Sequence, residues 1–495
     1  MSTAADTDVL IVGAGPVGLF LANECARRGI RWRLIEQHAS QSEHSKALAI
    51  FPRTLEILDM AGIAERFLQV ANRVTTVAVE THGHRLAAMH FEPPGTPYPF
   101  VAMVPQDVTE QLLCEALRAR GGHVDYLSSF VSAEPQEGCV LVSVDRSGSL
   151  ETVRASFVIG CDGAHSAVRH AVDVGFEGGE YAELFLLADV STNDARPATE
   201  MQLCPSEHGP VAIFPMSATR RRVVGTIGEA IGEAPTLELV RSILAQRGPP
   251  GLEARALHWS SYFRVHHRLA RTLRVGRIFL AGDAAHIHSP FGGQGMNTGL
   301  HDVWNLVWKL DLSLRGHASA QLLDSYGAER LPVIRSVIGM TDRLTKVMGT
   351  PSKFAQALRD AVIPMVSRLA PFQHAFVERL SELGIAYGGS PIIEGDGRRY
   401  FDDTIRGGRG IESRFILFLG RDAHIGTREA VTALCSELSG VLELRAGTAD
   451  GLTLVRPDGY VAAAVQAADA ARGLEALRSL IECQITPHHE VKAIQ

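Results

Sequence analysis

Residues 8–18 read Asp-Val-Leu-Ile-Val-Gly-Ala-Gly-Pro-Val-Gly, and this stretch decides the fold. An apolar run leads directly into Gly13, Gly15 and Gly18, which have the spacing GxGxxG, and a helical pattern follows over residues 17–28. A second apolar run covers residues 32–36. The order of strand, glycine-rich turn, helix and strand predicts a βαβ unit whose backbone N–H groups and helix N-terminus bind a pyrophosphate.

Glu36 ends the second predicted strand and suits a ribose site. An acidic side chain at this position accepts hydrogen bonds from ribose hydroxyls and disfavours a 2′-phosphate. The structural alternative is a glycine-rich turn that only packs tightly. The unit by itself does not distinguish FAD from NAD.

Two further apolar runs end in polar residues. Residues 157–161 lead into Asp162, and residues 278–281 lead into Gly282 and Asp283. Both are typical of buried parallel strands, whose carboxyl ends bind ligands in α/β sheets. For Asp283 the structural alternative is a cap on the segment that follows it.

Composition excludes several classes of protein. The chain has 495 residues, 46% of them hydrophobic and 21% charged, which predicts a globular protein of two or three domains. A net charge of -7 gives no support for nucleic-acid binding. The seven cysteines include no CxxC pair, so neither a disulfide framework nor a metal site is indicated. We expect a cytoplasmic protein without a signal peptide or a membrane span.

The later motifs carry a family resemblance. Residues 162–169 read Asp-Gly-Ala-His-Ser-Ala-Val-Arg, residues 281–286 read Ala-Gly-Asp-Ala-Ala-His, and residues 290–299 read Pro-Phe-Gly-Gly-Gln-Gly-Met-Asn-Thr-Gly. These stretches resemble the DGxxSxVR and GD motifs and the flavin loop of class A flavoprotein monooxygenases. The order of the motifs is similar to the para-hydroxybenzoate hydroxylase superfamily, particularly its polyketide and phenol hydroxylase branch.

The resemblance implies FAD as the cofactor and assigns residues to it. Asp283 matches the aspartate that bonds the ribityl chain, Gln106 matches a glutamine that contacts FAD, and Lys46 stands where the family has an arginine near the flavin. Lysine keeps the charge but not the bidentate fork, so a solvated lysine is the alternative. The implied FAD-binding residues are Gly13, Gly15, Gly18, Glu36, Lys46, Arg53, Gln106, Asp162, Asp283, Pro290, Gly293, Gly295, Met296 and Asn297.

The glycines of the flavin loop have a physical purpose apart from the family. A reduced flavin carries negative charge on one edge of its ring. Gly293 and Gly295 allow the backbone to approach a planar ring, and a helix that starts near Met296 directs its positive end toward that charge.

The chain has no second GxGxxG motif, so we expect NADPH or NADH to visit the flavin transiently. The resemblance links Ser166 and Arg169 to this step, with an ordinary interdomain ion pair as the alternative for Arg169.

The predicted class is α/β with an α+β insertion. A Rossmann-like FAD-binding domain takes residues 1–175 and 266–390, a β-rich substrate domain takes residues 176–265, and residues 391–495 look like a thioredoxin-like unit without redox cysteines. For the last unit we expect a scaffold role or a role in a homodimer.

Candidate substrate contacts come from the insertion, and candidate catalytic residues from the flavin loop. Met201, Phe214, Met216, Tyr262 and Phe263 are expected to line the substrate pocket, although core packing is their alternative. His286 and His288, with Pro290 beside them, are the candidate catalytic residues, and one histidine would deprotonate a phenol.

These expectations give one function and two alternatives. The resemblance implies a monooxygenase that hydroxylates a small phenolic or polyketide-like substrate with NAD(P)H and O2 through a flavin C4a-hydroperoxide. The same motifs are compatible with Baeyer–Villiger oxidation, epoxidation or dehydrogenation. A flavoprotein that only sequesters an aromatic compound is the second alternative.

Overall fold

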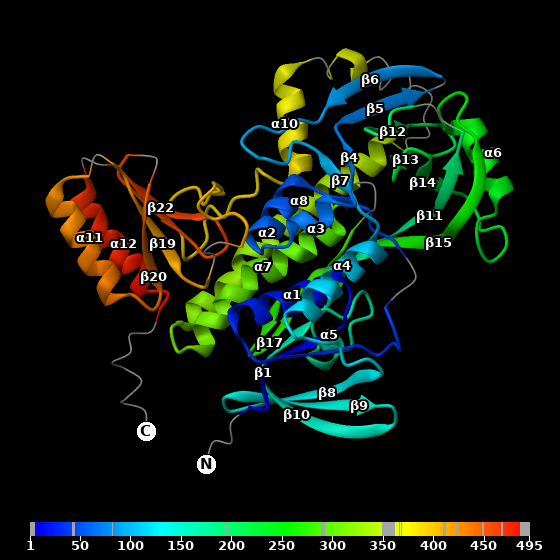
Figure 1. Ribbon diagram of the computed structural model, residues 1–495. Helices are drawn as coiled ribbons and strands as arrows, with labels where there is room; N and C mark the ends of the chain where they lie inside the picture. The colour runs from blue at the N-terminus through cyan, green and yellow to red at the C-terminus, as the bar shows by residue number, and fades with distance from the viewer. Residues whose placement is uncertain are drawn as a thin grey trace.

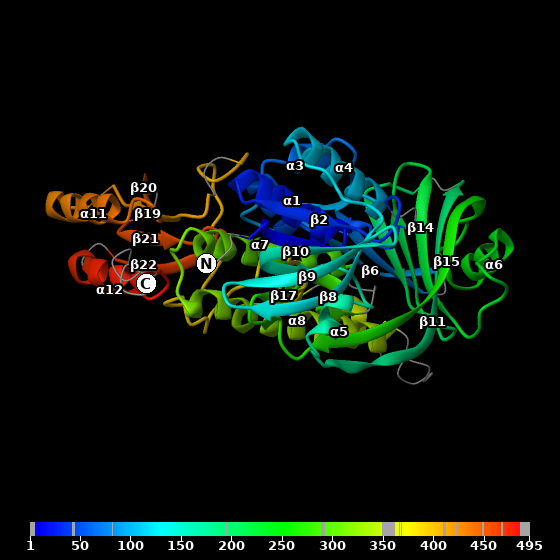
Figure 2. The ribbon, with the colours of Figure 1, turned by 90° about the horizontal axis from the view of Figure 1, so that it is seen from below.

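The computed structural model describes residues 5–41, 45–81, 83–193, 196–288, 293–348, 362–365, 367, 369–408, 412–421, 423–447, 450–466 and 469–485. Three parts lie in a row, with the part that contains the N-terminal βαβ unit between a β-rich part and a C-terminal unit (Figures 1 and 2). Helices and strands are mixed throughout, which confirms the predicted α/β class. No described helix combines the length and the apolar character that crossing a bilayer requires.

The first sheet brings the three sequence motifs to one edge. Its order is β16-β17-β10-β1-β2, and β10, β1, β2 and β17 pair in parallel. Val12 pairs with Gly160, which pairs with Leu280, so the three strands end at the same level. The bounds are β1 (Thr7–Val12), β2 (Trp32–Ile35), β10 (Ser149–Gly160), β16 (Arg274–Val275) and β17 (Ile278–Leu280).

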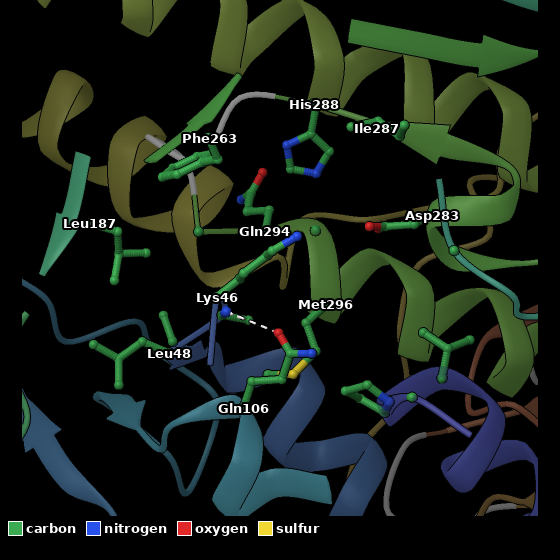
Figure 3. A pocket seen from close by; sticks show the side chains of 18 of the residues that line it. Lys46, Leu48, Gln106, Leu187, Phe263, Asp283, Ile287, His288, Gln294 and Met296 are labelled. Atoms are coloured by element: carbon green, nitrogen blue, oxygen red, sulfur yellow. Dashed lines mark hydrogen bonds between the residues drawn. The ribbon is translucent and has the colours of Figure 1, made fainter. Parts of the chain in front are cut away.

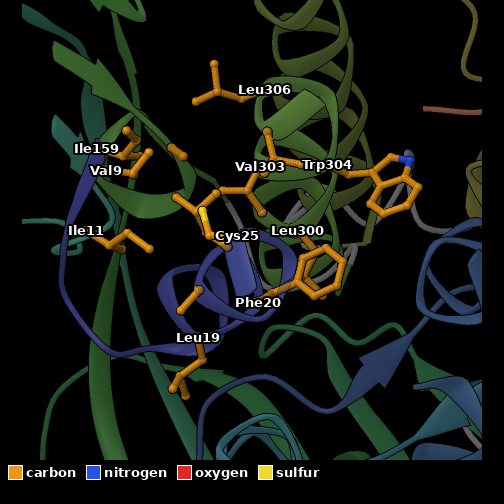
Figure 4. Packing of buried hydrophobic residues seen from close by; sticks show 14 of the residues in the cluster. Val9, Ile11, Leu19, Phe20, Cys25, Ile159, Leu300, Val303, Trp304 and Leu306 are labelled. Carbon is orange, nitrogen blue, oxygen red and sulfur yellow. The ribbon is translucent and has the colours of Figure 1, made fainter. Parts of the chain in front are cut away.

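Two helices cover this sheet and form the core with it (Figure 4). Helix α1 (Pro16–Arg28) and helix α7 (Gly295–Leu314) pack together, with Phe20 and Trp304 stacked at 6.3 Å between ring centroids. Burying one large apolar side chain contributes about 1.5–3 kcal/mol, and Leu19 and Val303 are fully buried here. The core therefore fixes the starts of both helices at the ligand-binding edge of the sheet.

The second sheet extends beyond the predicted insertion. Its order is β18-β15-β11-β14-β13-β12-β5-β6, so residues 76–90, far upstream in the chain, add two strands to it. The boundary predicted at residues 176–265 is therefore too narrow for this sheet, because β5 pairs in parallel with β12. The bounds are β5 (Thr76–Thr81), β6 (His84–His90), β11 (Phe176–Thr192), β12 (Glu200–Cys204), β13 (Val211–Pro215), β14 (Arg220–Ile227), β15 (Ala254–Ala270) and β18 (His286–Ile287).

The remaining elements of these two parts connect and cover the sheets. Strands β3, β7 and β4 form a small third sheet, and β8 and β9 extend β10 as an antiparallel ribbon. The bounds are β3 (Ala49–Ile50), β4 (Asn72–Val74), β7 (Val101–Met103), β8 (Ser128–Gln136), β9 (Cys139–Arg146), α2 (Pro52–Met60), α3 (Ala64–Leu68), α4 (Gln106–Ala119), α5 (Ala167–Ala171), α6 (Leu237–Arg247), the 3-10 turn η1 (Gly282–Ala284), α8 (Ala320–Met348) and α10 (Ala370–Ser381).

The C-terminal unit is a sheet of order β20-β19-β21-β22 with two helices. Residues 452–455 and 461–465 form a hairpin whose turn contains Gly459 at φ +77°. Glycine suits this left-handed backbone. The bounds are β19 (Phe415–Leu419), α11 (Ile425–Glu437), β20 (Leu442–Ala446), β21 (Leu452–Val455), β22 (Val461–Val465) and α12 (Ala470–Glu482).

Candidate active site

A cavity of about 430 Å³ lies between the first two sheets, and residues of all the predicted motifs border it. Its size falls in the range of small-molecule sites. Gly15, Asp283 and residues 293–296 border it together with side chains of the second sheet. Asp283 lies across the cavity from Leu187 and Phe263 (Figure 3).

The three glycines of the first motif have different tasks. Gly13 has φ +99°, and a Cβ there would lie 2.6 Å from the Cys161 carbonyl oxygen. A Cβ at Gly18 would lie 1.9 Å from the Gly13 oxygen. Gly15 borders the cavity, and no atom lies within 4 Å of an added Cβ. Gly15 therefore leaves room for a ligand, whereas Gly13 and Gly18 permit the close packing that shapes the turn.

Glu36 and Asp162 hold backbone turns near the cavity. The Glu36 carboxylate accepts hydrogen bonds from the backbone N–H groups of Ala14 (2.8 Å) and His38 (3.0 Å). Asp162 accepts from the Ser166 hydroxyl (2.6 Å) and the Val168 N–H (3.0 Å), which caps α5. Neither side chain borders this cavity, although Cys161 and Gly163 on either side of Asp162 do, so the cofactor contacts of Glu36 and Asp162 stay predictions.

Asp283 is the accessible carboxylate of the cavity. The protein around it removes solvent, which raises its pKa, and the charges of His286 and Lys46 oppose that shift. The turn that carries Asp283 is held tightly, since Cβ atoms at Gly282 and Gly299 would lie 2.9 and 2.6 Å from a Val17 methyl group. The turn, α1 and α7 thus meet at Val17.

His286 does not face the cavity. It is 1% exposed, and its Nε2 lies 2.7 Å from the carboxylate of Asp302. That carboxylate also accepts from Arg330 Nε (2.8 Å) and the Gly282 N–H (3.1 Å). Burial opposes ionisation of Asp302, but the charges of Arg330 and His286 hold its pKa below the ordinary value. The prediction of His286 as a catalytic base is therefore wrong: this histidine supports the turn of Asp283.

His288 is the histidine that borders the cavity. It lies two residues after His286, half-buried, with its Nε2 3.7 Å from the Cβ position of Gly295. Pro290, the third predicted catalytic residue, lies outside the described residues.

The loop before α7 presents its backbone to the cavity. Gly293 has φ +64°, and Gly293, Gln294, Gly295 and Met296 all border the cavity. Asn297 does not: its amide accepts from the Phe51 N–H and donates to the Ala49 and Gly293 carbonyls. The side chain of Asn297 therefore holds the loop in place, which corrects its predicted contact with the cofactor.

Residues 46–49 border the cavity beside this loop. Gln106 accepts from the Ala47 N–H at 3.1 Å and donates to Glu110 at 3.0 Å. Lys46 is exposed to the cavity and extends across it (Figure 3). Gln106 and Lys46 thus both border the cavity, and their contacts with the cofactor stay predictions.

Arg222 is a site residue that the sequence reasoning missed. It is 1% exposed, pairs with Asp189 (2.7 and 2.9 Å) and donates to the carbonyls of Lys46 and Ala47 (3.0 Å each). The second sheet thereby fixes the segment that carries Lys46. The run of three arginines, residues 220–222, gave only a weak signal, because a charge run usually faces solvent.

Two other arginines are turned away from the cavity. Arg53 is fully buried, pairs with Glu56 at 3.0 Å and stacks over Tyr460 of the C-terminal unit. Arg169 is 3% exposed and donates to the Ala164 and Ala284 carbonyls. The predicted contact of Arg53 with the cofactor is therefore wrong, and Arg169 serves local structure.

Phe214 and Phe263 form the aromatic part of the cavity wall, with Leu187 and Val224 beside them. Tyr262 lies on the opposite face of β15, where its hydroxyl donates to the Ile231 carbonyl at 3.0 Å. Met201 is 8% exposed within the apolar core of the second sheet, and Met216 packs against that core. Tyr262 thus faces away from the cavity, and neither Met201 nor Met216 borders it; the substrate contacts of the two methionines stay predictions.

The residues present fit FAD. Helices α1 and α7 both begin at the cavity, and among the described residues neither N-terminus has a side-chain cap. Such N-termini bind anionic groups. Asp283 offers an acceptor for a hydroxylated chain, Gly15 leaves space, and Lys46 supplies a cation.

Comparisons with known proteins agree with this geometry. The family model "FAD binding domain" matches residues 6–341. The uncharacterized aromatic compound monooxygenase YhjG of Bacillus subtilis is 34% identical over 486 residues, covering 93% of this chain and 94% of that protein. The 6-methylpretetramide 4-monooxygenase of Streptomyces rimosus is 34% identical over 400 residues, covering 79% and 71%. The structure of OxyS anhydrotetracycline hydroxylase from Streptomyces rimosus aligns with a TM-score of 0.79 and 28% identity over 97% of this chain and 99% of that chain. The chain therefore belongs to the class A flavin-dependent monooxygenases, the FAD-dependent family of aromatic hydroxylases.

Proposed function

We propose that this enzyme hydroxylates a phenolic or polyketide-like aromatic compound with NAD(P)H and O2. One observation carries the proposal: the residues that suit FAD and the aromatic wall of the second sheet border the same cavity. A planar aromatic substrate against Phe214 and Phe263 would thus lie next to the cofactor. The relatives support this substrate class, since they include enzymes named for a pretetramide and for anhydrotetracycline.

When bound, FAD would supply the redox chemistry, in which NAD(P)H provides two electrons, one oxygen atom of O2 enters the ring and the other leaves as water. The chain contributes position and environment. Its apolar wall excludes water, and the N-terminus of α7 faces the cavity with its positive end. His288 is the proposed base for a phenolic proton, because it borders the cavity and His286 does not.

The test is a screen of phenols and aromatic polyketides for substrate-stimulated NADPH oxidation by the FAD-loaded enzyme, followed by product mass. We expect oxidation to accelerate at least tenfold with a substrate, and the product to gain one oxygen atom with its ring intact. The variant His288→Gln should need a higher pH for the same rate, since the substrate would have to ionise without a base.

The alternatives give different results in the same assay. Ring expansion indicates Baeyer–Villiger oxidation, an epoxide indicates epoxidation, and loss of two hydrogens indicates dehydrogenation. Tight binding of an aromatic compound without faster NADPH oxidation would indicate a sequestering flavoprotein. Each of these outcomes would contradict the proposed hydroxylation.

A further inference from the structure

A second cavity, of about 590 Å³, lies between α8, α10 and residues 382–386. Gln294 of the flavin loop borders both this groove and the first cavity. A ligand in the groove would therefore lie beside the loop that faces the flavin.

One wall of the groove is a stripe on α8. Arg335, Gly339 and Arg343 follow each other at intervals of four residues, so they lie on one face of the helix. Gly339 leaves a gap between the two guanidinium groups, since no atom lies within 4 Å of an added Cβ. Arg379 on α10 borders the groove from the other side.

The three arginines are exposed, and among the described residues none of their guanidinium groups has an ion-pair partner. Glu378 is the exposed carboxylate at the rim. Glu382 is 3% exposed, and burial raises its pKa to about 8, so it is neutral at pH 7. The groove therefore carries net positive charge, which favours an anionic ligand.

The spacing of the stripe favours a ligand with two separate anionic groups. Eight residues of helix span roughly 12 Å, and open space lies at Gly339 between them, so Arg335 and Arg343 can each contact an anionic group of an extended ligand. The other arginine expected to contact a nucleotide, Arg169, is buried and bonded to backbone carbonyls.

We propose that this groove binds NADPH, with its diphosphate and its 2′-phosphate at the two ends of the Arg335–Gly339–Arg343 stripe. The inference rests on the proposed function, because it names the site of that reductant. NADH lacks the 2′-phosphate and can use only one end of the stripe. We therefore expect the enzyme to prefer NADPH.

The experiment measures NADP⁺ and NAD⁺ binding to the FAD-loaded enzyme by titration calorimetry, with no aromatic substrate present. The double variant Arg335→Gln/Arg343→Gln should weaken NADP⁺ binding at least tenfold and NAD⁺ binding much less, with unchanged FAD content. Arg421→Gln, on the exposed surface of the C-terminal unit, is the matched control and should change neither.

The opposite results overturn the inference. If the double variant and the wild type bind NADP⁺ with equal affinity, the nucleotide does not bind in this groove. A raised KM for the aromatic substrate with unchanged NADP⁺ binding would instead make the groove a substrate entrance. The enzyme can also be reduced by dithionite and then mixed with O2 and the aromatic substrate, which tests hydroxylation without any nucleotide. Hydroxylation in this experiment would support the proposed function even if NADP⁺ does not bind in the groove.

Discussion

Asp283 is the residue on which cofactor retention should depend most. It is the accessible carboxylate at the end of β17, and its turn is fixed by the packing of Gly282 and Gly299 on Val17. A hydrogen bond to a charged acceptor contributes about 1.5–3 kcal/mol. Asp283→Ala should therefore weaken FAD binding roughly 10- to 100-fold, measured by flavin fluorescence on titration of the apoprotein.

The control for this variant is Glu429→Ala on exposed α11, which should leave the affinity unchanged. Asp283→Asn keeps an acceptor oxygen and should recover part of the loss. If Asp283→Ala retains FAD as tightly as the wild type, the residue only caps the turn.

Glu110 should make stability depend on pH. It is 3% exposed, accepts a hydrogen bond from Gln106, and burial raises its pKa from 4.5 to about 7. The folded state holds the Glu110 proton more tightly than the unfolded chain does. Proton binding by Glu110 therefore stabilises the fold fully below about pH 4.5, less as the pH rises to about 7, and not at all above that. The free energy of unfolding of Glu110→Gln should thus exceed that of the wild type by up to about 3 kcal/mol at pH 8 and by little at pH 5. Urea unfolding at the two pH values measures this difference.

Glu137→Gln, at an exposed turn, is the control and should show no such pH dependence. If Glu110→Gln raises the free energy of unfolding equally at both pH values, the prediction is wrong. The effect of the substitution would then not come from the charge of Glu110.

Single residues also mark how far sequence reasoning reaches. Asp283 and Gln106 could be placed because each lies in a local motif, and both border the cavity. His286 could not be separated from His288, since its partner Asp302 lies on α7 and the contact depends on tertiary packing. Arg53 was misplaced for the same reason: Tyr460, which it contacts, lies in another part of the molecule.

At the scale of elements, β15 presents two adjacent aromatic residues to opposite faces of the second sheet. Phe263 borders the cavity, whereas Tyr262 packs on the other face and bonds the Ile231 carbonyl. Phe263→Ala should raise the KM for the aromatic substrate about tenfold, because about 1–2 kcal/mol of apolar contact is lost. Tyr262→Ala should leave KM unchanged and lower the free energy of unfolding by about 1–2 kcal/mol.

Steady-state kinetics and urea unfolding of both variants check this pair. The reverse pattern, with KM raised by Tyr262→Ala alone, would place the substrate on the other face of the sheet.

The elements themselves were predictable where the signal is local. The βαβ unit at residues 7–35 has the predicted order, and its ends differ by about one residue. The addition of β5 and β6 to the second sheet was not predictable, because strand pairing between residues 76–79 and 200–203 leaves no local pattern. Which face of β15 meets the cavity could not be predicted either, because a shift of one residue in strand register exchanges the two faces.

At the scale of the whole molecule, a buried cluster of charges joins the C-terminal unit to the nucleotide-binding part. Arg456 bonds both oxygens of Glu329 on α8, at 2.6 and 2.9 Å, and also pairs with Asp458. Lys309 on α7 lies 2.8 Å from Glu329, and all four side chains are fully buried. Burial lowers the pKa of Lys309 to about 8, although Glu329 opposes the shift. The cluster thus links the helix that begins at the flavin loop to the C-terminal hairpin.

Removing the central cation should break this link. Arg456→Met fills similar space but leaves Glu329 and Asp458 buried against Lys309 alone, with one negative charge in excess. An uncompensated buried charge costs about 3–5 kcal/mol, so we expect a large loss in the free energy of urea unfolding. Arg421→Met, on an exposed position of the same unit, should change it by less than about 0.5 kcal/mol. Helix α7 contributes Lys309 to the cluster and begins at the cavity, so the flavin content of Arg456→Met should fall with its stability. Full stability in this variant would show that apolar packing alone holds the C-terminal unit.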